Sequence, residues 1–180
     1  MKSLFAAAFL VTLSCAQSTA TAGVSYTPDD VATISAIRDG VSINSCEMYT
    51  DFNLKFDYCP KGYINDFAYP YCSAFLENFE KFDNKDWQNA VRTCLQNKLV
   101  DFAVSQEAYP SCQAISDAGF NSHQECYLLP NPANPELTWC NLSWSDMFNV
   151  AWIAKDAGLW EVLKEGVPVV YKCLAPMWPF

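Results

Sequence analysis

The stretch CSAFLENFEKFDNKDWQNAVRTC, which runs from Cys72 to Cys94, decides the fold of this chain. The apolar residues of its first half recur at the spacing of one helix face: Cys72, Phe75, Leu76, Phe79 and Phe82. Asp83 or Asn84 then supplies the N-cap of a second helix. The apolar residues of that second helix repeat the pattern: Trp87, Val91, Cys94, Leu95, Leu99 and Phe102. The stretch predicts a helical hairpin with a cysteine at each outer end, placed for cross-links to other segments.

Three further segments carry the signals of helices. The segment 27–41 begins with a threonine N-cap and a proline in the first turn, and apolar residues follow at helical spacing. The segment 110–126 begins with a proline and a serine and continues in the same way. A last helix begins at Ser143 or Ser145, with Gly158 as a break in its pattern.

The region from Cys46 to Tyr71 is rich in aromatic residues and gives a weaker signal. We expect a short helix over Glu47–Phe56, followed by a loop that Cys59 fixes to another part of the domain. A β-hairpin in this region stays open as an alternative, because the periodicity does not distinguish the two.

The fold class follows from these segments together. The prolines at positions 130, 132 and 135 predict a rigid, extended linker ahead of the last helix. No series of strands, internal repeat or low-complexity tract interrupts the helical pattern. The sequence therefore predicts an all-α fold, a disulfide-cross-linked helical bundle of about five helices.

Both ends of the chain are expected to lie outside this domain. Residues 1–22 have the charged start, the apolar core and the small-residue cleavage sites of a secretory signal peptide, cut after Ala16 or Ala22. No later segment reads as a transmembrane helix, because charges or prolines interrupt every apolar run. Residues 23–175 then form a single cysteine-rich α-helical domain, and residues 176–180 form an extended tail. We expect a secreted, extracellular protein without stable membrane insertion.

Cysteine number and charge agree with an extracellular protein. Of nine cysteines, Cys15 leaves with the signal peptide, and the remaining even number predicts four disulfides among 105 possible connectivities. Those eight are Cys46, Cys59, Cys72, Cys94, Cys112, Cys126, Cys140 and Cys173. A formal net charge of −9 repels phosphate backbones, so nucleic acid is not expected as a partner.

The sequence predicts no catalytic residue, metal site or cofactor. The single histidine, His123, has no nucleophile motif or metal-ligand set around it and is interpreted as a residue on the polar face of a helix. Four acidic residues lie close together around the hinge of the helical hairpin: Glu77, Glu80, Asp83 and Asp86. Their positions favour helix capping and solvation, with a calcium site or a pair of hydrolase carboxylates as the weaker readings.

The sequence also contains a glycosylation sequon and a high proportion of aromatic residues. Asn141-Leu142-Ser143 is an N-glycosylation sequon beside a cysteine, so Asn141 is the predicted glycosylation site. Aromatic residues make up 15% of the chain, and at helical positions they favour packing in the core. The aromatic region from Tyr49 to Tyr71 also allows a lipid-binding cavity.

The hairpin resembles the signature of stanniocalcins, the secreted cysteine-rich glycoprotein hormones. The matching residues are Cys72-Ser73-Ala74-Phe75-Leu76, then Lys81-Phe82-Asp83, then Val91 and Cys94. The segment that ends in Glu125-Cys126-Tyr127 is similar to the next helix of that family. Cys140 and Cys173 look like the following cysteine pair, so the resemblance covers roughly residues 59–173.

The resemblance implies a specific set of disulfides. Carried over by position, the family pattern joins Cys46 to Cys72, Cys59 to Cys112, Cys94 to Cys126 and Cys140 to Cys173. It also implies a non-enzymatic hormone or signalling factor that regulates calcium and phosphate homeostasis through a protein receptor or another extracellular protein partner.

This chain departs from the family in three ways. Vertebrate stanniocalcins carry further cysteines, including one that links two chains, and these are missing here, so only a noncovalent homodimer stays open. The basic, histidine-rich tail of the family is missing, and the glycosylation sequon lies at Asn141 rather than near the N-terminal cysteines. The alternative function is a secreted, helical, disulfide-rich carrier of lipid or sterol, which the aromatic content favours.

Overall fold

The computed structural model of the protein describes residues 23–55, 59, 61–155 and 159–174. These residues form seven α-helices and no β-strand, so the predicted all-α, disulfide-cross-linked fold is confirmed. The helices are α1 (Pro28–Asp39), α2 (Glu47–Lys55), α3 (Tyr69–Glu77), α4 (Lys85–Ser105), α5 (Cys112–Leu128), α6 (Trp144–Ala154) and α7 (Leu159–Leu174). The predicted signal peptide and the predicted tail lie outside the described residues.

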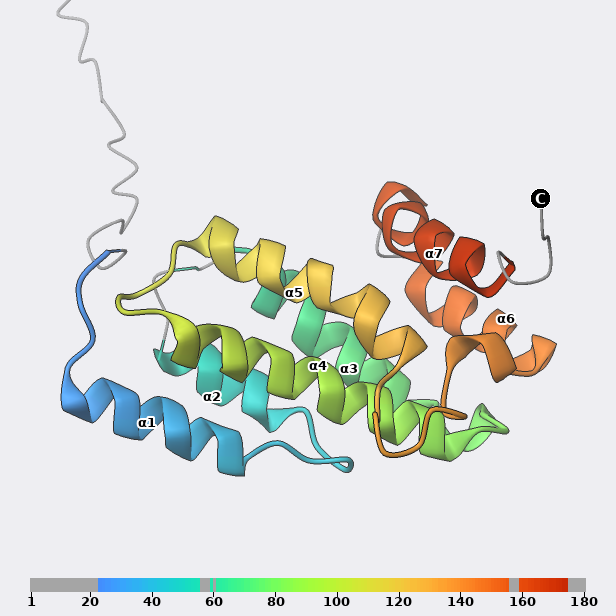
Figure 1. Ribbon diagram of the computed structural model, residues 1–180, viewed down its shortest axis with the longest axis horizontal. Helices are drawn as coiled ribbons and strands as arrows, with labels where there is room; N and C mark the ends of the chain where they lie inside the picture. Colours follow the sequence, from blue (N-terminus) through green and yellow to red (C-terminus); the bar gives the residue numbers. More distant parts are fainter. Residues whose placement is uncertain (1–22, 56–58, 60, 156–158, 175–180) are drawn as a thin grey trace, which may run out of the picture.

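Helices α4 and α5 run antiparallel through the centre of the molecule (Figure 1). Helix α1 packs along α4 and α2, and α2 and α3 lie behind α4 and α5 in this view. Helices α6 and α7 cover one end of the bundle, where α6 contacts α3 and α7 contacts α5. Segments from both halves of the chain therefore enclose the space between α3, α4, α5 and α6.

The helices begin where local capping chemistry predicts. Thr27 forms a capping box with Asp30 at the start of α1. The side chains of Asn84, Ser111 and Ser143 accept hydrogen bonds from backbone N–H groups in the first turns of α4, α5 and α6. The sequence left two N-cap positions open. Asn84, rather than Asp83, caps α4, and Ser143, rather than Ser145, caps α6.

The first helix of the predicted hairpin ends earlier than its apolar pattern indicates. Helix α3 ends at Glu77, and a 3₁₀ segment, η2 (Phe79–Lys81), replaces the expected last turn. The Asn78 amide donates to the carbonyl of Ala74 at 2.8 Å, and the backbone N–H of Asn78 donates to the same carbonyl at 3.2 Å, so both groups of this residue bond back to the last turn of α3. Phe82 still reaches the core, in extended backbone after the 3₁₀ turn.

The same helix also begins earlier than expected, after a π-helical segment, η1 (Tyr63–Ala68). Pro70 lies in the first turn of α3, where its missing N–H leaves no bond unmade. The β-hairpin alternative for this region is wrong, and the short helix after Cys46 is confirmed as α2.

Two further expectations about the second half need correction. The proline-rich segment before α6 is not extended, because consecutive turns join Asn134 to Asn131 and Leu137 to Asn134. The predicted last helix is two helices, since α6 ends at Ala154 and α7 begins at Leu159. Residues 156–158, which include the predicted break at Gly158, lie outside the described residues.

The core has two clusters of buried apolar side chains. One joins α1, α2 and η1 to the C-terminal half of α4 and to α5, and it includes Ile34, Phe52 and Leu99. The other joins the hairpin turn to α6, with Phe82 and Trp87 among its buried members. Burying apolar surface from both ends of the chain is the main stabilising contribution to this arrangement.

The ring of Tyr63 packs directly on the backbone of α5 at Gly119. A Cβ at position 119 would lie 2.3 Å from two ring atoms of Tyr63, which is closer than non-bonded carbon atoms approach each other in proteins. We therefore expect Gly119→Ala to lower the free energy of unfolding by about 1–3 kcal/mol. Urea unfolding followed by circular dichroism measures this difference.

A second helical glycine provides the control. A Cβ at Gly166 in α7 would meet no atom of the described residues within 4 Å. Gly166→Ala should therefore leave the stability unchanged or raise it by up to about 1 kcal/mol, because alanine is the better helix former. Equal effects of the two substitutions would show that the contact between Tyr63 and Gly119 is not tight.

Candidate functional site

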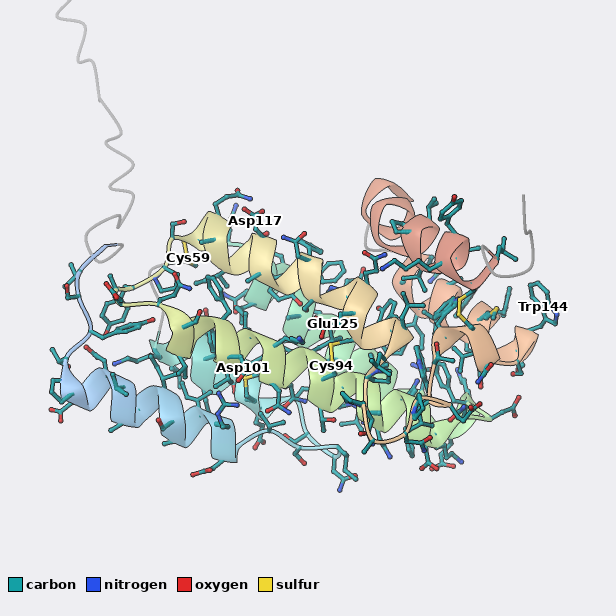
Figure 2. All side chains as sticks on the ribbon, viewed as in Figure 1. Cys59, Cys94, Asp101, Asp117, Glu125 and Trp144 are labelled. Carbon is teal, nitrogen blue, oxygen red and sulfur yellow. A yellow bond between two sulfur atoms is a disulfide. The ribbon has the colours of Figure 1, made fainter. Side chains whose placement is uncertain are left out.

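Four disulfides tie the segments around the bundle together, and they are the four pairs that the stanniocalcin resemblance implies. Cys46–Cys72 and Cys59–Cys112 fasten the segments on either side of α2 to α3 and α5. Cys94–Cys126 joins α4 to α5, and the sulfur bond between these two helices is visible in Figure 2. Cys140–Cys173 joins the 3₁₀ segment η3 (Trp139–Asn141) to α7.

The predicted glycosylation site lies on the surface. Asn141 is exposed at the end of η3, and its amide donates to the backbone and side-chain oxygens of Glu136. The sequon residue Ser143 is also exposed and caps α6.

The predicted carboxylate cluster acts as a set of helix-end contacts. Glu80 pairs with Lys85 at 2.7 Å, and Asp83 accepts a hydrogen bond from Ser143 at 3.0 Å. Asp86 lies in the first turn of α4, where a negative charge is favourable. In the part of the chain that the structure describes, no group of three His, Cys, Asp or Glu residues is placed to hold a metal ion.

Sequence reasoning missed the most important carboxylate of this region. Asp146 in α6 is completely buried and accepts the backbone N–H groups of Asp83 at 2.8 Å and Asn84 at 2.9 Å. It therefore binds α6 to the turn of the helical hairpin. Its sequence position, in the first turn of a helix, gives only the ordinary signal of a favourable helix-end charge.

A cavity of about 80 Å³ lies between η1, α3, α4 and α5. Its walls are mainly aromatic: Tyr49, Tyr63, Phe67, Tyr71, Phe75 and Tyr127. The lining also includes the polar side chains of Gln88, Arg92 and His123. The aromatic region from Tyr49 to Tyr71 therefore supplies much of the wall of a cavity, as the sequence allowed, and binding of lipid there stays a prediction.

A second apolar chamber of about 170 Å³ adjoins the first, between α5, α6 and α7. The two chambers share four lining residues: Phe67, His123, Tyr127 and Ala154. Because the same side chains line both, the two chambers lie next to each other at this point. An apolar cavity of about 150 Å³ holds a molecule the size of benzene, so the pair has room for a small organic ligand.

His123 is buried at the junction of the two chambers, so its interpretation as a polar-face residue is wrong. Its Nδ1 lies 3.0 Å from the carbonyl oxygen of Gly119 and 3.2 Å from that of Phe120. Since both neighbours are acceptors, Nδ1 carries the proton in the neutral ring. Burial lowers the pKa of His123, which keeps the ring uncharged in the cavity.

Arg92 and Gln88 lie one turn apart on α4 at the edge of the first chamber. Arg92 Nη1 donates to the carbonyl of Ile43 and to Asn89 Oδ1, and Nη2 donates to Gln88 Oε1 at 3.3 Å. Burial lowers the pKa of Arg92, while the neighbouring Tyr49 acts in the opposite direction. Burial also raises the pKa of Tyr49 well above its usual range, so that phenol stays neutral.

The outer face of α6 carries exposed aromatic side chains. Trp144, Phe148 and Trp152 follow each other at intervals of one helical turn and are 88%, 65% and 57% exposed. Trp144 points away from the bundle at the edge of the molecule (Figure 2). Exposed aromatic residues in a row are typical of surfaces that bind another molecule.

The fold and these sites together define a class, a disulfide-cross-linked α-helical protein with an internal, mainly aromatic cavity. No family model, curated protein or solved structure matches this chain. None of the helices in the described ranges is long and apolar enough to span a lipid bilayer.

Proposed function

We propose that this chain is a secreted, non-enzymatic, stanniocalcin-like signalling glycoprotein that regulates calcium and phosphate transport through a protein partner. The four disulfide pairs carry the proposal, because they are the pairs expected from the resemblance among 105 connectivities. The exposed aromatic face of α6 supports binding to a protein partner, and the exposed Asn141 supports glycosylation.

The test applies the purified secreted protein to ion-transporting epithelial cells and measures radiolabelled calcium and phosphate uptake. We expect a dose-dependent, saturable change that disappears after reduction and alkylation, because the disulfides hold the binding surface together. A matched variant, Trp144→Ala with Phe148→Ala, should fold normally and lose potency if α6 contacts the partner. Unchanged uptake at every dose of folded protein would exclude the regulatory role.

A second candidate function, carriage of a small lipid-like ligand, is favoured by the two adjoining apolar chambers. Native mass spectrometry of protein secreted by a lipid-rich host should then show a bound species that organic extraction removes. Protein that carries no added mass and binds no apolar probe would argue against this function.

A further inference from the structure

Hydrogen-bond donors remain unused at the α4 edge of the first chamber. Gln88 and Arg92 are only 4% and 5% exposed. Gln88 Nε2 and Arg92 Nε are nevertheless buried without a hydrogen-bond partner among the described residues. Buried donors are almost always satisfied in proteins, because an unsatisfied one costs about 1–3 kcal/mol. Two such groups within one helical turn indicate that something else supplies the acceptors.

The same edge carries a positive charge that no described acidic side chain neutralises. None of the ion pairs among the described residues includes Arg92, and its hydrogen bonds go to carbonyl and amide oxygens, which are neutral. The ring of Phe79 lies 5.7 Å from the guanidinium and adds only a weak cation–π attraction. A buried cation without a counter-ion is costly, so this edge favours an anion.

The rest of the chamber favours an apolar group attached to that anion. Aromatic rings from η1 and α3 form the wall, and the second chamber adjoins the first at His123 and Ala154. The neutral His123 adds no second positive charge along this path. Scaling from about 150 Å³ for benzene, the two chambers accommodate a tail of roughly ten carbon atoms.

From this geometry we infer that the cavity binds a medium-chain carboxylic acid, with its carboxylate on Arg92 and Gln88 and its tail among the aromatic rings. A carboxylate supplies one negative charge and two adjacent acceptor oxygens, which match one guanidinium and one amide. A dianionic phosphate would leave an uncompensated negative charge in an apolar space. The inference rests on the second candidate function, ligand carriage, and is independent of the signalling role.

The first experiment compares three ligands of equal length on the delipidated full-length secreted protein. Isothermal titration calorimetry with octanoate, 1-octanol and octylamine separates the contribution of the head group from that of the tail. We expect octanoate to bind at least about tenfold more tightly than 1-octanol, because hydrogen bonds to charged groups are the stronger ones. Octylamine should bind most weakly, since its ammonium would face Arg92.

An isosteric variant tests the anion-binding edge without removing the buried arginine. Gln88→Glu places a carboxylate beside Arg92, so it should raise the melting temperature and weaken octanoate binding at least tenfold. The control is Gln124→Glu on α5, a residue that lines neither chamber, which should leave octanoate binding unchanged. Ala154→Leu narrows the junction and should weaken octanoate and 1-octanol alike.

The outcomes separate the inference from the function on which it rests. Equal affinities for octanoate and 1-octanol would overturn the carboxylate site and leave the carrier function standing. Failure of all three ligands to bind would overturn both. Octanoate binding that Gln88→Glu leaves intact would show that the anion lies elsewhere, and would also overturn the inference.

Discussion

Replacing Cys94 and Cys126 together by alanine is expected to lower the free energy of unfolding by about 4–5 kcal/mol. The disulfide closes a loop with a sequence separation of 32 residues, and loop closure alone accounts for about 3–4 kcal/mol. Cys126 is completely buried between α4 and α5, so losing its sulfur adds about 1 kcal/mol for the space left behind. The melting temperature should fall by about 10–15 °C.

The disulfide between η3 and α7 is a control with nearly the same loop length. Cys140–Cys173 closes a separation of 33 residues, but Cys140 is exposed. If constraint of the unfolded chain were the whole effect, the two double variants would lose equal stability. We expect the Cys94/Cys126 variant to lose about 1 kcal/mol more, because only it disturbs a packed interface. Thermal unfolding of both variants by differential scanning calorimetry makes the comparison.

The Cys94–Cys126 variant should also lose the ligand cavity. Arg92 lies two residues before Cys94 on α4, and His123 lies three residues before Cys126 on α5, so the disulfide fixes the spacing of these two walls. Octanoate affinity should therefore fall in this variant while the Cys140/Cys173 variant keeps more of it. If the free energy of unfolding of the Cys94/Cys126 variant is less than about 1 kcal/mol below that of the wild type, the predicted role of the cross-link is contradicted.

Local chemistry explains why the helix starts could be predicted. Thr27, Asn84, Ser111 and Ser143 each accept a hydrogen bond from the backbone N–H three residues later, so the capping signal lies entirely within a short window. The helix ends were less predictable. Asn78 bonds back to Ala74 where α3 ends, and the apolar pattern that continues to Phe82 hides this end.

The cavity residues could not be assigned from sequence because their burial is set by distant segments. Arg92 on α4 is buried, and its guanidinium donates a hydrogen bond to the carbonyl of Ile43, 49 residues earlier in the chain. His123 reads as a polar-face residue of α5, yet α5 packs against η1 and α7 as well as α4. When a helix packs against neighbours on several sides, polar residues such as His123 can be buried. The apolar periodicity of a single helix does not show how many neighbours the helix has.

Replacing Asp146 by alanine is expected to lower the free energy of unfolding by about 2–4 kcal/mol and to loosen α6 from the hairpin. The buried carboxylate accepts both backbone N–H groups at the hinge, and hydrogen bonds to a charged acceptor contribute about 1.5–3 kcal/mol each. Other contacts between α6 and the hairpin remain, from Ser143 to Asp83 and from Asn149 to the Lys81 carbonyl. The loss should therefore stay below the sum of the two bonds.

The isosteric variant Asp146→Asn separates the acceptor role of the carboxylate from its volume. Its amide keeps one acceptor oxygen but turns an NH₂ group toward the second backbone N–H, so we expect a loss of about 1–3 kcal/mol. Asp86→Ala, at an exposed position in the first turn of α4, should change stability by about 0.5 kcal/mol or less. Hydrogen exchange should show earlier loss of protection at the Asp83 and Asn84 amides in both Asp146 variants. The expectation is contradicted if the Asp83 and Asn84 amides keep wild-type protection and Asp146→Ala unfolds with the same free energy as Asp86→Ala. Apolar packing around Phe82 and Trp87, rather than the carboxylate, would then hold the hinge.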